Sequence, residues 1–522
     1  MHQRAQERST DGVRVPTLRW AALAGLVSGI AGLAIADLAA WLVSSIGSPV
    51  TAVGELIINL LPAPLINFGK DTLGTADKPI LIALVTLGVV ALCAWAGRLE
   101  FGRRLAGAAV FAAVAVIGFV GVGVRAGSDI RAYVPTLVGL LAGYMILSSL
   151  ITRLHRWYAR RAADGPASSA RRSFLGTTVL VGALAAVAAV AGRALAGAAT
   201  AVNEARSRIQ LPQAATPAPP VPAGVDLGIA DLTPYVTDNA DFYRIDSALQ
   251  VPRIDQDQWS LKVTGMVEKE VTLTFAELSN LPLVEHMTTL TCVSNEIGGD
   301  LIGNAMWLGY PIRDLLARAK PLPGADMVLS TSEDGWTAGT PLSALQETDR
   351  QAMLAIGMNG EPLPIEHGFP VRMVVPGLYG YVSATKWVVE MKLTTFAEDQ
   401  GFWTPLGWSA MGPIKIGSRI DLPRRTSPAG TVVVAGIAWA QHTGIDRVEV
   451  QVDGGDWVQA ELAETTGPDT WRQWKYDWPA AAGDHTIAAR ATDTAGNVQT
   501  ADTAPPAPDG ATGYDSVKVK IS

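Results

Sequence analysis

The sequence has few of the residues that form the common protein-bound metal and haem centres. Its 522 residues include only two cysteines, Cys93 and Cys292, and six histidines. Neither cysteine belongs to a CxxC or CxxCH motif, which argues against disulfide scaffolds, c-type haem, zinc ribbons and cysteine-ligated iron–sulfur clusters. No two histidines lie at helical spacing within an apolar run. A haem held between membrane helices is therefore not expected.

Charged residues are also scarce. They make up 17% of the chain, hydrophobic residues make up 49%, and the net charge is -7. Outside short clusters beside apolar segments there is no large block of basic residues, so a phosphate backbone has little to bind and nucleic acid is not an expected partner. A chain of this length should contain several domains, and its composition predicts that one of them lies in lipid.

Residues 1–200 are predicted to form an all-α transmembrane region. Five apolar runs are long enough to cross a hydrocarbon core of about 30 Å. They cover approximately Leu18–Val43, Pro79–Gly97, Leu105–Val124, Val134–Ile151 and Phe174–Leu195. The segment Val50–Phe68 contains Glu55 and two prolines and is interpreted as interfacial or re-entrant. Asp37 and Glu55 are the main charges within these runs, and such sparse charge gives a transporter little support.

The positions of the arginines predict the orientation of this region. Arginines cluster before the first run, between the second and third, and between the fourth and fifth, and these positions share one side. Basic residues are retained in the cytoplasm, so everything after about residue 196 is predicted to lie outside it. Arg171 and Arg172, followed by Ser173-Phe174-Leu175, also resemble a twin-arginine export motif. A simple positive-inside cluster is the alternative interpretation.

The remainder of the chain is predicted to contain a linker and two folded domains. Residues 201–225 are rich in proline and are interpreted as a semi-extended spacer. Residues 226–425 mix short strands, such as Trp259–Val263 and Met373–Val375, with helices such as Ile312–Ala319, which indicates an α+β domain. Residues 426–522 contain three strand-like runs separated by turn signals and are predicted to form a small β-sandwich. These runs are Thr431–Ala435, Arg447–Val452 and Thr486–Ala491.

Cys292 is the most informative single residue of the polar half. It follows a strand-like run and lies among small polar residues, between Thr291 and Ser294. A cysteine nucleophile would need a nearby histidine, and His286 is six residues upstream. Most unpaired cysteines are nevertheless buried core residues, so the pattern alone leaves both interpretations open.

Several motifs in consecutive order resemble the sulfite-oxidase family of molybdopterin enzymes. The resemblance covers about residues 240–500. The segments that carry it are Thr289–Asn295, Ala305–Gly309, Ile312–Leu316, Met358–Pro364, His367–Arg372, Val375–Gly377, Lys386-Trp387, Gly436–Trp439, Val448–Val450 and Asp453–Gly455. The first resembles the segment that supplies the molybdenum-ligating cysteine. The last three resemble the immunoglobulin-like dimerisation domain of the family.

The resemblance implies a fold, a cofactor and a set of site residues. It implies a sulfite-oxidase-type α+β domain that binds a molybdenum-molybdopterin cofactor, followed by an immunoglobulin-like β-sandwich that supports a homodimer. Cys292 would ligate the metal, because a soft thiolate suits a high-valent metal already bound by dithiolene sulfurs. The other expected cofactor contacts are Ser294, Asn295, His367, Arg372 and Lys386, and the expected pocket residues are Trp307 and Gln400.

Departures from the family pattern put the substrate in doubt. Glu296 and Ile297 occupy a stretch where sulfite oxidases carry arginines, and Gln400 replaces the active-site tyrosine in Asp399-Gln400-Gly401-Phe402. No haem-binding or flavin-binding motif occurs, so electrons must pass to or from a separate carrier, such as a cytochrome or a quinone-linked protein. The expected protein is a bacterial, multi-pass membrane oxidoreductase that transfers an oxygen atom to or from a small substrate.

Two alternatives to this function remain. One is a reductase of S-oxides or N-oxides, similar to the bacterial methionine-sulfoxide reductases that share the fold, because loss of the arginines favours a neutral substrate. The other is a non-catalytic membrane module in which the same fold serves only to bind a partner. The joint presence of Cys292, His367, Arg372 and Lys386 argues against the second alternative.

Overall fold

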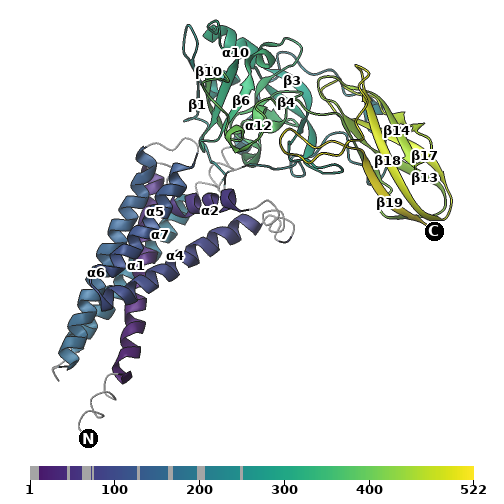
Figure 1. Cartoon of the computed structure of the whole chain (residues 1–522). Helices are drawn as coiled ribbons and strands as arrows, with labels where there is room; N and C mark the ends of the chain where they lie inside the picture. Colours follow the sequence, from purple (N-terminus) through teal and green to yellow (C-terminus); the bar gives the residue numbers. More distant parts are fainter. Residues whose placement is uncertain are drawn as a thin grey trace. The chain divides into compact units, whose positions relative to one another are not determined.

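The chain forms two compact units (Figure 1). The structure is a computed structural model that describes residues 11–43, 48–61, 72, 76–125, 130–162, 168–196, 206–246, 248 and 251–522. The helical unit comprises Met1–Ala201 and Ala248–Gln250, and the second unit comprises Val202–Ser247 and Val251–Ser522. Each unit has its own hydrophobic core.

The described part of the helical unit contains six α-helices and one short 3-10 helix. They are α1 (Asp11–Val43), α2 (Pro49–Leu60), α4 (Asp77–Gly102), α5 (Ala106–Gly123), η4 (Ile130–Tyr133), α6 (Val134–Ala162) and α7 (Ser168–Ala196). All except α2 and η4 contain a stretch long and apolar enough to cross a membrane, and these five helices coincide with the five predicted runs. Helix α2 has 12 residues, too few to span, and the rest of the predicted interfacial segment lies outside the described residues.

Glycines allow the long helices to pack closely. Helix α1 contacts α4, α6 and α7. Gly25 of α1 and Gly97 of α4 face each other so closely that a Cβ atom at either position would overlap backbone atoms of the other helix. Apolar helices in lipid have no hydrophobic driving force to associate. Small residues at a crossing let them approach closely and gain van der Waals contact instead.

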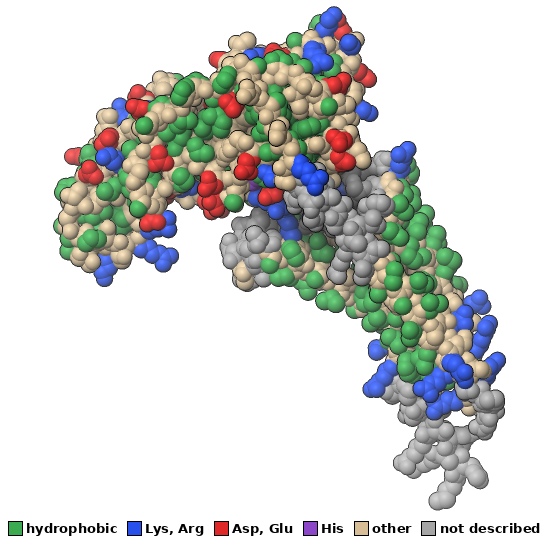
Figure 2. Space-filling view, turned by 180° about the vertical axis from the view of Figure 1, so that it is seen from behind, with side chains coloured by type: hydrophobic (Ala, Val, Ile, Leu, Met, Phe, Trp, Pro, Cys, Tyr) green, Lys and Arg blue, Asp and Glu red, His purple; other side chains and the backbone are tan. Residues whose placement is uncertain are grey.

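Basic side chains gather at one end of the helical unit (Figure 2), where several aromatic rings also pack together. Trp20 from the start of α1 lies 5.9 Å from Trp157 and 6.1 Å from Phe174, measured between ring centroids. The guanidinium of Arg171 lies over the Trp157 ring at 5.9 Å. Exposed arginines of the same helix ends and loops are Arg103, Arg104, Arg156, Arg160, Arg161 and Arg172. Helix α7 begins at this end.

The second unit begins with an αβ region, defined here as residues 206–416, that contains two five-stranded sheets. The first, called the site sheet below, has the order β3-β4-β7-β8, with β9 also paired to β7. Its strands are β3 (Val284–Thr291), β4 (Ile302–Pro311), β7 (Met353–Met358), β8 (Glu361–Pro362) and β9 (Arg372–Val374). All of these pairings are antiparallel.

The second sheet of the αβ region has the order β2-β1-β10-β5-β6. Its strands are β1 (Ser260–Gly265), β2 (Val271–Thr274), β5 (Met327–Ser332), β6 (Thr337–Pro341) and β10 (Val388–Thr394), and only β1 and β10 pair in parallel. The helical turns are η5 (Ala223–Val225), α9 (Phe275–Ser279), α10 (Ile312–Ala319), α11 (Leu342–Gln346), η6 (Ile365–His367), α12 (Gly380–Ser383) and η7 (Thr404–Leu406).

The site sheet separates two hydrophobic clusters. On β4, Leu308 and Tyr310 belong to the large cluster shared with the second sheet and α10, whereas Ala305 and Trp307 belong to a smaller cluster on the other face. This division follows from the two-residue period of a strand, whose successive side chains point to opposite faces. Because neither face is left to solvent, β4 and β7 are buried along almost their whole length.

Residues 417–521 form two packed sheets, called the sheet pair below. One has the order β11-β13-β17-β16 and the other β12-β19-β18-β14-β15. The strands are β11 (Gly417–Leu422), β12 (Thr426–Ser427), β13 (Gly430–Trp439), β14 (Ile445–Val452), β15 (Val458–Gln459), β16 (Glu461–Leu462), β17 (Arg472–Ala480), β18 (Gly483–Asp493) and β19 (Asp515–Ile521). Alternate apolar side chains of both sheets fill the core between them.

The proline-rich segment is extended, but over residues 206–225 it is not a free spacer. Arg206 donates to the carbonyl oxygens of Pro362 and Leu363, and Thr216 pairs with Val284 at the start of β3. Leu211 packs against the large cluster of the αβ region. Arg206, Leu211 and Thr216 therefore hold this segment against the αβ region. Prolines cannot donate hydrogen bonds, but the residues between them can still pair with a neighbouring strand.

Candidate functional site

Cys292 lies immediately after the last residue of β3, at the edge of the site sheet. Its backbone N–H donates to the carbonyl oxygen of Leu301 at 2.9 Å, so the loop from Cys292 to Leu301 closes on itself. The backbone N–H of Ser294 points at the Cys292 Sγ atom at 3.4 Å. A donor directed at sulfur favours the thiolate form that binds metals. The Cys292 side chain is 9% exposed, at the border of the protein interior.

Asn295 and Ser294 have different positions in this loop. Asn295 is buried, and its Oδ1 atom accepts a hydrogen bond from the Leu301 N–H at 2.9 Å. This contact fixes the shape of the loop that presents Cys292. Ser294 is exposed. Of the two, only Ser294 presents its side chain to the space outside the loop.

His367, Arg372 and Lys386 meet at the short helix η6. Gly368 follows His367 with a φ of 111°, a conformation that favours glycine, and a Cβ atom there would lie 2.9 Å from the Arg372 Cβ and 3.1 Å from the Lys386 Cβ. Arg372 donates to the His367 carbonyl oxygen at 3.1 Å, and Lys386 Nζ donates to the Glu366 carbonyl oxygen at 3.0 Å. The close backbone approach at Gly368 therefore brings a histidine and two cationic side chains together.

This cationic cluster contains more positive charge than its neighbours neutralise. Arg372 is buried, and among the described residues it hydrogen bonds only to the carbonyl oxygens of Met373, His367 and Ala384. Lys386 has one carboxylate partner, Asp246, at 3.3 Å. Burial lowers the pKa of Arg372 to about 10. Burial and the charge of Arg372 lower the pKa of Lys386 to about 8, against the opposing effect of Asp246.

His367 is affected by the same burial and by the positive charges of Lys386 and Arg372. Burial, followed by the charges of Lys386 and Arg372, lowers the pKa of His367 to about 3. Its Nε2 atom lies 3.2 Å from the carbonyl oxygen of Asn239, whereas its buried Nδ1 atom has no hydrogen-bond partner among the described residues. Because the ring is neutral and its Nε2–H faces a carbonyl oxygen, Nδ1 is an unsatisfied acceptor that a ligand N–H can satisfy, whereas the neighbouring Arg372 and Lys386 suit an anionic group.

Tyr243 connects this cluster with the Cys292 end of β3, and no pattern in the sequence predicted it. Burial raises the pKa of Tyr243, the charge of Cys292 raises it further, and the charge of Arg372 lowers it. Its hydroxyl and the carbonyl oxygen of Thr291, the residue before Cys292, both lie within 4.0 Å of the Cβ position at Gly380, and its ring stacks on Phe242, which contacts the His367 ring. Tyr243 lies outside every segment that carries the family resemblance, so motif comparison gave no reason to select it. Asp246, the partner of Lys386, was missed for the same reason.

Trp307 and Gln400, the two predicted pocket residues, have different surroundings. Trp307 is fully buried, donates its indole N–H to the Thr288 carbonyl oxygen at 3.2 Å and lies under the Arg372 guanidinium, 5.1 Å from its ring. Its ring also meets Phe242 at 5.8 Å, and Phe242 contacts the His367 ring, so Trp307 belongs to the packing beneath the cluster. Gln400 is exposed, next to Gly401, which packs against Gly339 of β6. No contact in the described residues links Gln400 to the other predicted site residues.

Comparison with known proteins identifies the family. Residues 248–403 match the oxidoreductase molybdopterin binding domain. An uncharacterized oxidoreductase of Bacillus subtilis, YuiH, is 35% identical over 159 residues, which cover 30% of this chain and 76% of that protein. The human mitochondrial sulfite oxidase is 29% identical over 323 residues, which cover 52% of this chain. This chain belongs to the sulfite-oxidase family of molybdopterin-dependent oxidoreductases.

The match to members of the sulfite-oxidase family is partial in length. The chain spans 58% of the human sulfite oxidase. Among solved structures, the sulfane dehydrogenase SoxCD from Paracoccus pantotrophus has a TM-score of 0.49 at 24% identity and covers 55% of this chain and 82% of that one. The family match includes Cys292, His367, Arg372 and Lys386, and it ends before the sheet pair begins.

The residues of this site fit the cofactor that the sulfite-oxidase family implies. Molybdopterin carries a phosphate and polar ring edges, and the buried Arg372 and Lys386 together with the unsatisfied Nδ1 of His367 supply matching charge and hydrogen bonding. The Cys292 sulfur, with an N–H directed at it, is a suitable soft ligand for molybdenum. When bound, such a cofactor supplies two-electron redox chemistry at the metal.

Proposed function

We propose that this chain is a membrane-anchored, extracytoplasmic oxidoreductase in which Cys292 binds molybdenum and His367, Arg372 and Lys386 bind the pterin. Oxygen-atom transfer on a small substrate is the reaction that this assignment supports best. The observation that carries the proposal is the buried Arg372 guanidinium, which among the described residues contacts only carbonyl oxygens, beside the unsatisfied Nδ1 atom of His367. Tyr243 joins this cluster to the end of β3 that presents Cys292: its ring stacks on Phe242, which contacts the His367 ring at 5.6 Å, and its hydroxyl and the Thr291 carbonyl oxygen both lie within 4.0 Å of the Cβ position at Gly380.

Electrostatics near Cys292 favour a neutral substrate over an anionic one. The loop after Cys292 exposes two carboxylates, Glu296 and Asp300, and contains no arginine or lysine. Negative potential at the mouth of a site lowers the local concentration of anions such as sulfite. The second candidate function, reduction of an S-oxide or N-oxide, is therefore supported by these two carboxylates. In either direction the chain needs an external electron carrier.

The helical unit supports the proposed location. Its arginine-rich and aromatic end has the composition of a cytoplasmic membrane boundary. Helix α7 starts at this end, so its carboxyl end, at Ala196, lies at the opposite end of the unit. The residues that follow would then be delivered outside the cytoplasm, which agrees with the resemblance of Arg171 and Arg172 to an export motif.

The sheet pair supports a role in assembly. Two antiparallel sheets with a shared core are the architecture of an immunoglobulin-like domain, and we assign it that class. Homodimer formation through this region is part of the proposal, as are contacts of the helical unit with lipid.

The molybdenum content of the detergent-purified chain tests the proposal, with Cys292→Ser measured beside it in a host that makes the cofactor. About one molybdenum per chain, and loss of dye-linked activity by at least about 100-fold in the variant, are expected because a direct metal ligand should matter at least as much as the groups around it. Cys93→Ser, which changes the other buried cysteine, is the matched control. A parent chain without molybdenum would favour the non-catalytic module instead.

The substrate screen then separates the two candidate functions. Sulfite is offered with an oxidising dye, and methionine sulfoxide and trimethylamine N-oxide are offered with a reduced dye. Faster turnover of the neutral oxides is the expected outcome, given Glu296 and Asp300. Turnover of sulfite alone would contradict the electrostatic argument.

A further inference from the structure

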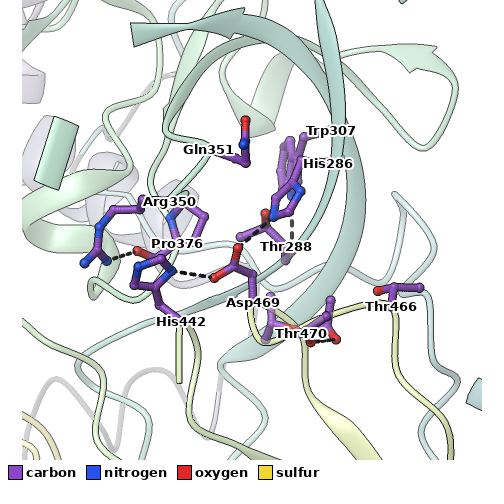
Figure 3. Close-up of polar contacts among 12 residues, drawn as sticks. His286, Thr288, Trp307, Arg350, Gln351, Pro376, His442, Thr466, Asp469 and Thr470 are labelled. Carbon is purple, nitrogen blue, oxygen red and sulfur yellow. Dashed lines mark hydrogen bonds and ion pairs between the residues drawn. The ribbon is translucent and has the colours of Figure 1, made fainter. Parts of the chain in front are cut away.

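The carboxylate of Asp469 connects the sheet pair to the αβ region through two histidines (Figure 3). Its Oδ2 atom lies 2.7 Å from His286 Nε2 and its Oδ1 atom lies 3.1 Å from His442 Nδ1. His286 belongs to β3, whereas His442 follows β13 and Asp469 precedes β17. Burial raises the pKa of Asp469, but the hydrogen bonds and charges of the two histidines outweigh it and the net shift is downward. The buried carboxylate is therefore ionised at neutral pH.

The contacts of the sheet pair continue along β3 as far as the residue before Cys292. The Thr289 N–H donates to the Asp469 carbonyl oxygen at 3.0 Å, and the Trp471 N–H donates to Thr289 Oγ1 at 2.8 Å. Gln441, which is buried, donates its Nε2–H to Thr291 Oγ1 at 2.7 Å. The alternate residues at 289 and 291 thus receive hydrogen bonds from outside their own sheet, at the end of the strand that presents the thiolate.

A second path leads from Asp469 to the other side of the site. His442 packs against Gly377, where an added Cβ atom would lie 2.8 Å from the His442 Cβ and 2.7 Å from Arg350 Nη1. Arg350 donates to the Pro376 carbonyl oxygen at 2.7 Å and forms an ion pair with Glu347, whose Oε2 lies 3.7 Å from His442 Nε2. The backbone then runs from Gly377 to Gly380, whose surroundings include the Thr291 carbonyl oxygen and the Tyr243 hydroxyl.

We infer that Asp469 is a positioning residue for the redox site, although it lies in the sheet pair. By binding His286 and His442 together, its carboxylate fixes both the β3 strand that ends at Cys292 and the turn from Pro376 to Gly380. The sheet pair is then part of the machinery that sets the direction of the Cys292 sulfur, in addition to any role in assembly. This inference rests on the proposed function, because it concerns the geometry of a metal ligand.

The test uses the full-length chain loaded with cofactor and the variant Asp469→Asn, which keeps the side-chain shape but cannot accept from both imidazoles. The matched control is Asp453→Asn, because Asp453 forms a similar pair with His485 at 2.6 Å entirely within the sheet pair. Three quantities are measured. They are amide hydrogen exchange of residues 286–292 by mass spectrometry, the electron paramagnetic resonance spectrum of the Mo(V) state, which depends on the orientation of the thiolate, and kcat in a dye-linked assay.

Asp469→Asn should speed exchange in residues 286–292 at least about tenfold and change the Mo(V) spectrum, with kcat reduced by roughly ten- to a hundred-fold. Asp453→Asn should leave all three at parental values. If Asp469→Asn does not fold, His286→Gln removes one arm of the network and should give the same changes at smaller size.

Two results would overturn the inference. Exchange in β3 at the parental rate would mean that Asp469 does not hold this strand. Faster exchange with an unchanged Mo(V) spectrum would mean that the contact is structural and does not position the ligand. A parent chain without molybdenum overturns the proposed function, and this inference with it. That failure is recognised separately, because hydrogen exchange needs no metal.

Discussion

Two arginines of the second unit lie over tryptophan rings in contrasting surroundings. In the αβ region, Arg372 lies 5.1 Å from the Trp307 ring, is buried, and among the described residues contacts carbonyl oxygens but no carboxylate. In the sheet pair, Arg490 lies 4.3 Å from the Trp457 ring, is part-exposed and forms an ion pair with Glu449 at 2.9 Å. The first arrangement leaves a positive charge without a counter-ion, and the second neutralises it.

The difference separates a binding site from a scaffold. A buried charge with no counter-ion costs free energy, and it persists where the surrounding fold is stable enough to tolerate it. A paired charge at the surface contributes little either way. The burial of Arg372 without a counter-ion among the described residues is therefore better explained by a ligand than by stability. Lys386 beside it shares its one carboxylate partner, Asp246, with Arg244, whereas the charges of the sheet pair need no such explanation.

Replacing the two tryptophans, one at a time, should give the largest difference in unfolding free energy between the αβ region and the sheet pair. Trp307→Ala should lower the free energy of unfolding by about 3–5 kcal/mol, because a fully buried indole leaves a large cavity. Trp457→Ala should cost less than about 1 kcal/mol, since the ring is only part-buried. Urea unfolding followed by circular dichroism measures both. If both variants lost the same free energy of unfolding, Trp307 in the αβ region would not be more tightly packed than Trp457 in the sheet pair.

Replacing the two arginines tests whether the uncompensated charge serves the cofactor. Arg372→Met should lower the molybdenum content at a fixed cofactor supply by roughly ten- to a hundred-fold, because the methionine keeps the contact with Trp307 but loses the charge. Arg490→Met should leave the molybdenum content unchanged. Metal analysis of the purified chains gives the answer. Full occupancy in Arg372→Met would remove Arg372 from the proposed site.

Two histidines should respond to acid in opposite directions. The pKa of His367 is lowered to about 3 from 6.5, so between these values the unfolded chain binds a proton that the folded chain does not, and stability falls as the pH drops. The hydrogen bond with Asp453 raises the pKa of His485, so its contribution is present below about 6.5 and is lost as the pH rises through the folded-state pKa.

Thermal unfolding of cofactor-free protein between pH 4 and pH 9 measures these contributions. His367→Gln should reduce the loss of Tm between pH 6.5 and pH 4. His485→Gln should lower Tm at pH 5 and change it least at pH 9. Parallel pH profiles for the two variants would contradict the assignment of opposite environments.

The smallest effect should come from the charge pairs of the sheet pair. Glu449→Gln removes the partner of Arg490 and of Arg447, and it should destabilise the chain by about 1 kcal/mol or less. Molybdenum content and activity should stay at parental values. A loss of cofactor in this variant would show that the sheet pair contributes charge to the site, contrary to the comparison.

Much of the fold was predictable because local patterns decide it. The helix predicted over Ile312–Ala319 forms with these bounds as α10, since its apolar residues recur at helical spacing and face the core. The five apolar runs give the five long helices, because length and composition alone determine them. The strand predicted at Met373–Val375 is displaced by one residue, to Arg372–Val374, a shift that pairing with β7 decides.

The site was predictable only where a motif carries it. Cys292, His367, Arg372 and Lys386 were selected by resemblance, and three of them meet at Gly368. Tyr243 and Asp246 come from a stretch without a matching motif, and Asp469 lies 177 residues beyond Cys292. Contacts between such distant positions depend on how sheets pack, which periodicity does not report. The docking of residues 206–225 on β3 was missed for the same reason.

The hydrogen bonds that cross from the sheet pair to β3 also limit how independently the αβ region and the sheet pair can be exchanged. The family match ends at residue 403, yet Thr289 and Thr291 are satisfied by residues 471 and 441. A gene fusion or recombination that exchanged the sheet pair for an unrelated one would leave these groups, and His286, without partners beside the metal ligand. The two regions are separable as a description of topology, but they should be inherited and transplanted as one piece.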